Sequence, residues 1–149
     1  MSMVPKTFKE ARATFIAMGG KEGARCYVGQ KALLREESAN VMQLYCVVDD
    51  VVSHRVVAFH RDGTMRLSSV LRAATEAMQH TLAEALHGSN WSLRKSLAGE
   101  GRWLLCHASG RRRVFVGDEV LRRNDTFDEF EARIAFAALA SEDKIARGR

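Results

Sequence analysis

The stretch VVSHRVVAFHRDGTMRL, residues 51–67, decides the fold expected for this chain. A long apolar run over 51–60 is followed by the turn sequence RDGT and by a short second run over 65–67. An Asp-Gly pair accepts the positive φ angles that a tight hairpin turn requires. The stretch therefore predicts two antiparallel strands joined by a tight turn.

Outward from this hairpin, short apolar runs separated by turn residues predict further strands. The acidic pairs Glu36-Glu37 and Asp49-Asp50 are expected at the turns between them. The runs are ARCYVG (24–29), KALLR (31–35), NVMQLYCVV (40–48), NWSLRKSL (90–97), GRWLLCHA (101–108) and RRVFVG (112–117).

Three segments have the apolar spacing of amphipathic helices, over about 7–18, 69–87 and 127–140. Ser69 is expected to cap the second helix, and Thr126 with Glu129 has the spacing of a capping box. Grouped strands favour an α+β fold with antiparallel sheet of about six to eight short strands and three helices. We expect a single domain over 1–149, with natural parts over 1–87 and 88–149.

Charge is distributed unevenly along the chain, whose net charge is +5. Residues 88–123 contain 8 basic and 3 acidic groups, so this segment alone accounts for the whole excess. A localised basic segment indicates an anionic partner. The chain has no apolar stretch long enough to span a membrane and no signal-peptide pattern. Three widely spaced cysteines suit buried free thiols, and we expect a cytoplasmic protein.

The basic segment contains the candidate binding residues. Arg111, Arg112 and Arg113 are adjacent and lead into an apolar strand, so alternation must point them to different faces. Arginine donates hydrogen bonds to phosphate or carboxylate, and aromatic rings on a sheet stack on bases. The predicted binding residues are Arg94, Lys95, Arg102, Arg111, Arg112, Arg113, Trp91, Trp103 and Phe115.

A second interpretation of the basic segment stays open at this point. Trp103 and Phe115 can equally be core residues, with the arginines solvated at an edge that discourages sheet-to-sheet aggregation. Neither the three-residue charge run nor the interleaved rings distinguishes the two, because no sequence motif of a known RNA-binding module accompanies them.

Residue pairs with catalytic or metal-binding potential are better explained structurally. His80, Glu84 and His87 lie at i, i+4 and i+7, which would suit a metal, but they lie opposite the apolar stripe of the helix. Cys106 and His107 are strand neighbours and must face opposite sides, as expected for a core cysteine and an edge histidine. We therefore expect no enzyme activity, no metal and no cofactor.

A resemblance to a known group of proteins covers about residues 51–121. RVVAFHRDGTMRLSS (55–69), a helix containing Thr75, NWSLRK (90–95) and GRWLLCHASGRRRVFVGDEVL (101–121) carry it. This pattern resembles small uncharacterised proteins encoded by bacteriophages and other mobile elements. The chain departs from that pattern at 69–71, where Ser-Val-Leu replaces the usual Gly-Gly-Trp.

The resemblance implies an accessory protein that acts in a bacterial cytoplasm and blocks a host defence or nucleoprotein complex, as anti-CRISPR inhibitors do. Its partner is then an anionic host protein, a nucleoprotein or a nucleic acid, and no membrane is involved. The alternative is a small nucleic-acid-binding protein without an inhibitory target, and a small enzyme ranks third. The identity of the partner and the oligomeric state stay open.

Overall fold

The computed structural model describes residues 4–21, 23–28, 31–49, 51–69, 71, 75–96 and 102–136. Two named helices are α1 (Phe8–Ala17) and α2 (Glu76–Leu86), and residues 127–136 form a third, the C-terminal helix. The strands are β1 (Cys26–Val28), β2 (Ala32–Ser38), β3 (Val41–Val48), β4 (Val51–His60), β5 (Met65–Leu67), β6 (Trp91–Lys95), β7 (Trp103–His107), β8 (Arg112–Val114) and β9 (Glu119–Leu121).

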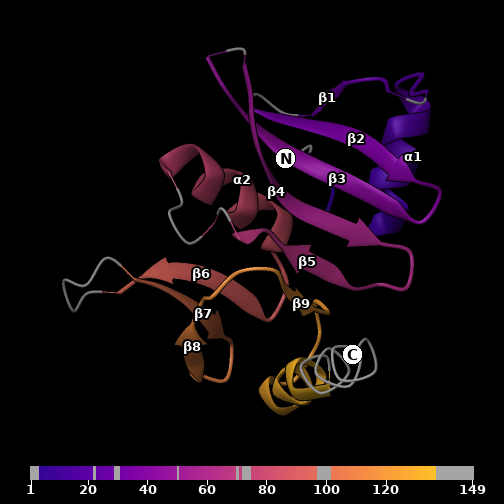
Figure 1. The fold of residues 1–149 in the computed structure, drawn as a ribbon. Coiled ribbons are helices and arrows are strands. Elements are labelled where there is room, and N and C mark those ends of the chain that lie inside the picture. The colour runs from indigo at the N-terminus through magenta and orange to yellow at the C-terminus, as the bar shows by residue number, and fades with distance from the viewer. Residues whose placement is uncertain are drawn as a thin grey trace, which may run out of the picture.

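The strands form two antiparallel sheets, which confirms the α+β prediction (Figure 1). The first sheet has the order β1-β2-β3-β4-β5-β9, and the second has the order β6-β7-β8. β9 follows the second sheet in the chain and yet pairs with β5 of the first. This pairing links the parts over 1–87 and 88–149, and the buried residues of both belong to one hydrophobic cluster.

The hairpin that decides the first sheet forms as predicted. β4 and β5 pair in antiparallel register, and Gly63 in the turn has φ of 93°. The Asp62 carboxylate accepts hydrogen bonds from the backbone N–H and the hydroxyl of Thr64, at 2.9 and 2.6 Å. These bonds hold the pKa of Asp62 below its ordinary value, chiefly through the Thr64 hydroxyl.

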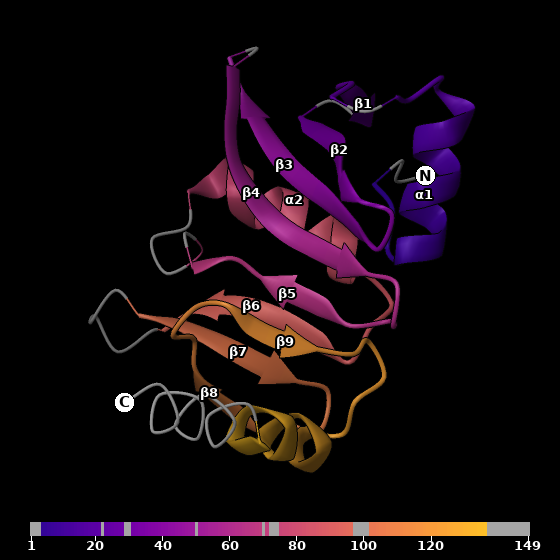
Figure 2. The ribbon, with the colours of Figure 1, turned by 45° about the vertical axis from the view of Figure 1, so that its right-hand side comes forward.

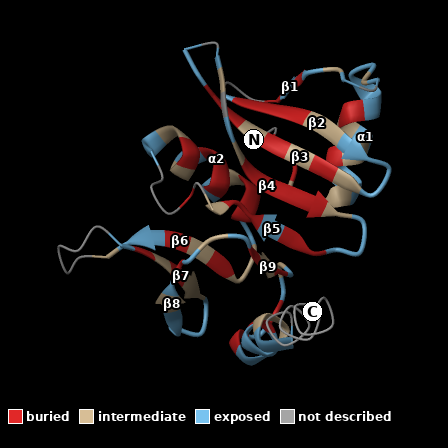
Figure 3. Ribbon diagram, in the orientation of Figure 1, coloured by how far each residue is buried: buried red, intermediate tan, exposed pale blue. Residues whose placement is uncertain are grey.

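Both α1 and α2 contact β3 and β4 and cover one face of the first sheet, as Figure 2 shows from a second angle. α1 also contacts β2, and α2 also contacts β6 of the second sheet. The cover buries Ala11 and Phe15 of α1 and Met78 and Leu82 of α2. Figure 3 colours buried residues red, and red segments of both helices and of the strands meet in this layer. The opposite face of the sheet is covered by neither helix.

The start of α2 corrects one sequence prediction. The helix was expected from residue 69 with Ser69 as its cap, but it begins at Glu76. Thr75 is the N-cap, and its hydroxyl accepts a hydrogen bond from the Met78 backbone N–H at 3.3 Å. Leu71 is buried outside α2, in a turn in which its N–H bonds to the Ser68 carbonyl at 3.1 Å. Leu71 has the spacing of a helical apolar residue but lies in a tight turn, and for this reason the predicted helix began too early.

Two strand features were also predicted wrongly. Glu36 and Glu37 lie inside β2 and not at a turn, next to a β-bulge before Ser38. β9 was not predicted as a strand, because a three-residue run with an acidic first position has little strand character. Its pairing with β5 depends on tertiary structure and not on its own residues.

The C-terminal helix begins with the predicted capping box. The Thr126 hydroxyl accepts from the Glu129 N–H, and the Glu129 carboxylate accepts from the Thr126 N–H, both at 3.1 Å. Phe127 and Phe130 are buried against the second sheet. Its predicted continuation over 137–140 lies outside the described residues. Among the helices that the structure describes, none is long and apolar enough to cross a membrane.

The orientation of α2 predicts unequal effects of two substitutions on it. Leu82 is 1% exposed, whereas the His80 side chain is 65% exposed. Leu82→Ala should lower the free energy of unfolding by about 2–5 kcal/mol through lost burial and a cavity. His80→Ala should change it by no more than about 0.5 kcal/mol. Urea unfolding of both variants measures the difference, and equal effects would contradict this orientation of α2.

Candidate functional site

The three aromatic rings among the predicted binding residues are buried. The exposed fractions of these residues are 3% for Trp91, 7% for Trp103 and 3% for Phe115. The Trp91 ring lies 4.7 Å from that of Phe130, and its Nε1–H donates to the Arg122 carbonyl at 3.0 Å. These rings are therefore not exposed for base stacking, and the interpretation of Trp103 and Phe115 as core residues describes their positions.

The arginine run is divided between the two faces of the second sheet. Arg113 pairs with Leu105, which is fully buried, and Arg112 pairs with Cys106, which is half-buried. Since successive residues of a strand alternate in direction, Arg112 points outward and Arg113 points toward the C-terminal helix. The three adjacent charges thus do not form one contact edge.

Arg111 is held by the C-terminal helix. Its guanidinium donates to the carboxylates of Asp128 at 2.6 Å and Glu131 at 3.0 Å. Its Cζ atom also lies 4.3 Å from the centroid of the Phe127 ring, within the range of a cation–π contact. Arg111 is half-exposed but its donors are directed to groups of the protein itself.

Arg113 lies beside a buried carboxylate. Its Cζ is 5.6 Å from the Phe130 ring centroid, and its Nε is 3.7 Å from Oε1 of Glu119. Glu119 is 5% exposed, and besides Arg113 its carboxylate interacts with the Val116 backbone. Burial raises the pKa of Glu119, against the smaller opposing effect of the Arg113 charge.

The outward side of the second sheet carries positive charge around an apolar centre. Arg94 and Arg112 are exposed, Val114 is 39% exposed, and Leu104 and Cys106 are half-buried. None of the residues paired there is acidic. The register places two rows on this side, Ser92–Cys106–Arg112 and Arg94–Leu104–Val114, and we call these six residues the outer face of the second sheet.

The two remaining predicted cations lie at the ends of the β6–β7 pair. Lys95 ends β6 and Arg102 directly precedes β7, and both are exposed. The Ser96 N–H donates to the Arg102 carbonyl at 2.8 Å, which continues the strand pairing by one step. Both residues therefore extend the positive charge toward the open end of this hairpin.

Cys106 and His107 point to opposite faces as predicted, but their roles are exchanged. The His107 ring lies 4.8 Å from that of Trp91 on the packed side. Its Nδ1 accepts from the Ser109 N–H at 3.0 Å, and its Nε2–H donates to the Asp125 carbonyl at 2.8 Å. Cys106 lies on the outer face. The expected core cysteine with an edge histidine is therefore wrong.

The predicted histidine pair on α2 stays at the surface. His80 is exposed, and its Nε2 lies 2.7 Å from Oε1 of Glu84. His87 is the C-cap of α2 and is exposed as well. In the part of the chain that the structure describes, no three His, Cys, Asp or Glu residues are placed to hold a metal ion.

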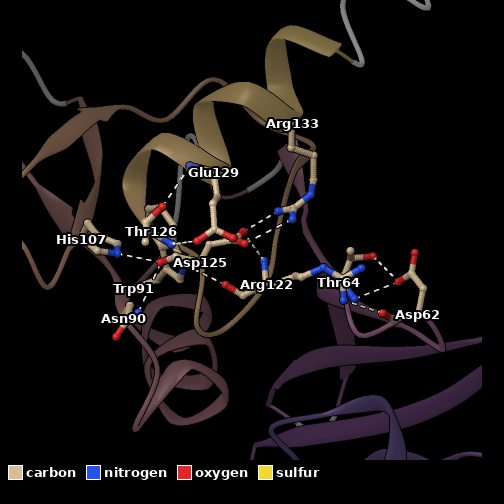
Figure 4. A network of polar contacts seen from close by, with 10 residues as sticks. All are labelled: Asp62, Thr64, Asn90, Trp91, His107, Arg122, Asp125, Thr126, Glu129 and Arg133. Carbon is tan, nitrogen blue, oxygen red and sulfur yellow. Dashed lines mark hydrogen bonds and ion pairs between the residues drawn. The ribbon is translucent and has the colours of Figure 1, made fainter.

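The segment between β9 and the C-terminal helix contains a buried carboxylate network (Figure 4). Asp125 is 2% exposed, and its carboxylate accepts from the Arg122 N–H at 2.7 Å and from two nitrogens of Arg133. The hydrogen bond that Arg133 donates to the Asp125 carboxylate raises the pKa of Arg133. The Asp125 carbonyl accepts from Asn90 at 3.3 Å and from His107 at 2.8 Å.

Two arginines extend this network to other elements. Nη1 of Arg122 donates to the Asp62 carbonyl in the β4–β5 turn at 2.6 Å. Arg123 donates to the carbonyls of Ala85 at 2.7 Å and His87 at 2.5 Å, at the C-terminus of α2. Burial lowers the pKa of Arg123, as expected for a guanidinium that replaces water at a helix end.

An open depression of about 390 Å³ lies over the same segment. Its charged groups already bond to one another or to backbone N–H and carbonyl groups, so we assign it a structural role. It is lined by Gly63, Arg122, Arg123, Asn124, Asp125 and Glu129.

Sequence reasoning missed the network because it counted Arg122 and Arg123 only as charges. One signal was available: Asp125 directly precedes the capping threonine, and Arg133 follows it by eight residues. Arg133 lies on the second turn of the helix that this threonine caps, and side chains of a helix point back toward its N-terminus, so Arg133 can reach a carboxylate just before the helix start.

No family model, no curated protein and no solved structure matches this chain. The features that bear on its function are therefore the two sheet surfaces and the charges on them.

The Asp125 network predicts a large loss of stability when its carboxylate is removed. Asp125→Asn should lower the free energy of unfolding by about 3–5 kcal/mol, because it leaves Arg133 without its buried partner. Asp128→Asn is the matched control. Its side chain is 84% exposed, and loss of its ion pair should cost no more than about 1 kcal/mol. Urea unfolding measures both, and similar losses would contradict the central role of Asp125.

Glu119 predicts a dependence of stability on pH. Its folded pKa is raised above the ordinary value of 4.5, so the native state binds the proton more tightly and loses stability as pH rises through the folded pKa. The Glu119→Gln variant has no titratable group at this position, so its side chain stays neutral at every pH. The variant should therefore gain stability relative to the wild type as the pH is raised through a range that begins below the ordinary carboxyl pKa of 4.5.

Urea unfolding across that range measures the difference. Glu37→Gln, on an exposed residue of β2, controls for the loss of one negative charge. A difference between Glu119→Gln and wild type that is constant with pH would contradict the raised pKa.

Proposed function

We propose that this protein acts by binding, and that the outer face of the second sheet docks an anionic partner. The observation that carries the proposal is the pair of registered rows in which exposed Arg94 and Arg112 flank Leu104, Cys106 and Val114. A guanidinium offers a planar set of donors to carboxylate or phosphate, and an apolar centre contributes through burial. The combination fits a partner that is acidic around an apolar contact.

The composition of this surface favours a protein over a nucleic acid as its partner. Arginine around apolar residues is typical of protein interfaces, whose rims are polar. Sheet surfaces that bind single strands instead use exposed aromatic rings, and the aromatic rings of this sheet are buried. The net charge of +5 also favours an acidic partner through faster electrostatic encounter.

A narrower proposal follows from the resemblance to proteins of phages and mobile elements. On that basis the partner is a host nucleoprotein or defence complex, and binding blocks its activity. An assay in bacterial cells with an active CRISPR effector tests it: expression of this protein should restore infection by a targeted phage. Unchanged interference would remove CRISPR effectors from the candidate partners.

The docking proposal predicts which arginines matter for binding. The double variant Arg94→Ala/Arg112→Ala should weaken binding to the partner by tenfold or more, because each charged hydrogen bond contributes about 1.5–3 kcal/mol. Lys9→Ala/Lys21→Ala removes the same charge from exposed residues elsewhere and should leave the affinity almost unchanged. Captured proteins from a bacterial lysate, with and without nuclease, identify the partner, and titration with that protein measures the affinity.

Two outcomes of this experiment would contradict the proposal. The first is equal binding of the partner by the wild type and the double variant. The second is an equal loss of binding in the lysine control, since that would show that only net charge matters. Equal thermal midpoints of the three proteins establish that a loss of binding does not come from unfolding.

A further inference from the structure

The first sheet has an open face that the described helices leave uncovered. α1 and α2 both lie on its other side: Figure 2 shows α2 behind β3 and β4, and Figure 1 shows α1 behind the ends of β2 and β3. Its register places two rows of residues on the open side, one across β1–β4 and one across β2–β5 and β9. The rows are Tyr27–Leu33–Tyr45–Arg55 and Arg35–Gln43–Ala58–Arg66–Val120, and we call these nine residues the open face of the first sheet.

Burial confirms that this face is distinct from the core. Leu34 and Leu44 alternate with the open-face residues along their strands and belong to the main hydrophobic cluster. Leu33 and Ala58 are also buried, at 0% and 2% exposure, but they lie outside that cluster. Their registered neighbours on this face are larger side chains, Tyr27 and Tyr45 beside Leu33 and Gln43 and Arg66 beside Ala58, so the two form an apolar floor between them.

Aromatic rings are available on this face, in contrast to the second sheet. Tyr27 is 50% exposed and Tyr45 is half-buried. The Tyr45 hydroxyl donates to Oε1 of Gln43 at 2.9 Å, which fixes the direction of the ring. The Cζ atom of Arg35 lies 5.9 Å from the centroid of the same ring. Since neighbouring strands are about 4.8 Å apart, the two tyrosines stand about 10 Å apart on β1 and β3.

The charges of the open face have one sign. Arg66 is exposed, and Arg35 and Arg55 are half-buried. No registered position on this face is acidic. Glu36 and Glu119 are adjacent to open-face residues along their strands, but they pair with the buried Met42 and Leu67 of the other side, and Glu37 lies at the bulge that ends β2. Among the ion pairs of the described residues, none involves these three arginines.

We propose that the open face of the first sheet binds single-stranded nucleic acid. Bases would stack on Tyr27 and Tyr45, while Arg35, Arg55 and Arg66 pair with phosphates. Stacking accepts any base because every base has a π face, so the binding has little sequence preference. An open sheet face suits an extended strand, whereas reading of a duplex needs an element that projects into a groove.

This inference does not depend on the proposed function, because the two surfaces share no residue and expect partners of different chemistry. The test uses the full chain and a fluorescein-labelled single strand of 12 thymidines, followed by fluorescence polarisation at low and at physiological salt. Binding should weaken steeply with salt, as phosphate contacts require. A duplex of the same length should bind at least tenfold more weakly.

Variants assign the binding to this face. Tyr27→Ala should weaken it by about tenfold, within the range for loss of one stacked base, and Tyr27→Phe should retain it. Arg66→Ala, on an exposed residue, should lower the affinity and reduce the dependence on salt by about one phosphate contact. Arg94→Ala/Arg112→Ala, on the second sheet, should bind the strand as the wild type does. Thermal midpoints show which variants are folded. If Tyr27→Ala does not fold, the binding by Arg66→Ala decides whether the strand binds this face.

Three outcomes would overturn the proposal. One is the absence of binding at low salt. Another is a loss of binding in the second-sheet variant but not in Tyr27→Ala or Arg66→Ala. The third is displacement of the strand by polyglutamate at equal charge concentration, which would show that the face binds acidic chains of any kind, including those of a protein.

Discussion

The buried Asp125 carboxylate is the contact on which the arrangement of the two sheets depends. The carboxylate accepts from the backbone of its own turn and from the guanidinium of Arg133. The backbone carbonyl of Asp125 accepts from Asn90, directly before β6, and from His107 of β7. The neighbouring Arg122 reaches the first sheet at the β4–β5 turn. One short segment thus joins both sheets and the C-terminal helix through groups that water cannot easily replace.

Strand alternation determines which surfaces remain for partners. In each sheet one side is apolar and covered by helices. The residues that alternate with those apolar residues along each strand point to the other side. On the second sheet this rule divides Arg112 from Arg113 and leaves arginines around an apolar centre. On the first sheet it gathers tyrosines and arginines from five strands, although they are scattered between residues 27 and 66 in the chain.

The local patterns of the chain were sufficient for most of the hairpins and helix ends. The Asp62-Gly63 turn and the capping box at Thr126 each use interactions within four residues, so they can be inferred without the fold. The predicted start of α2 was wrong because the apolar spacing extends back to Leu71, and spacing alone does not distinguish a helix from a buried turn.

The sequence by itself determined the α+β class, the hairpin register and the concentration of positive charge over 88–123. Only the tertiary structure decided which of those charges face outward, that Arg122 and Arg123 bond to distant carbonyls, and that β9 joins the first sheet. The physical reason is the range of the interactions. Turns and caps depend on neighbours in the chain, whereas the exposure of a charge depends on packing against elements far away in sequence.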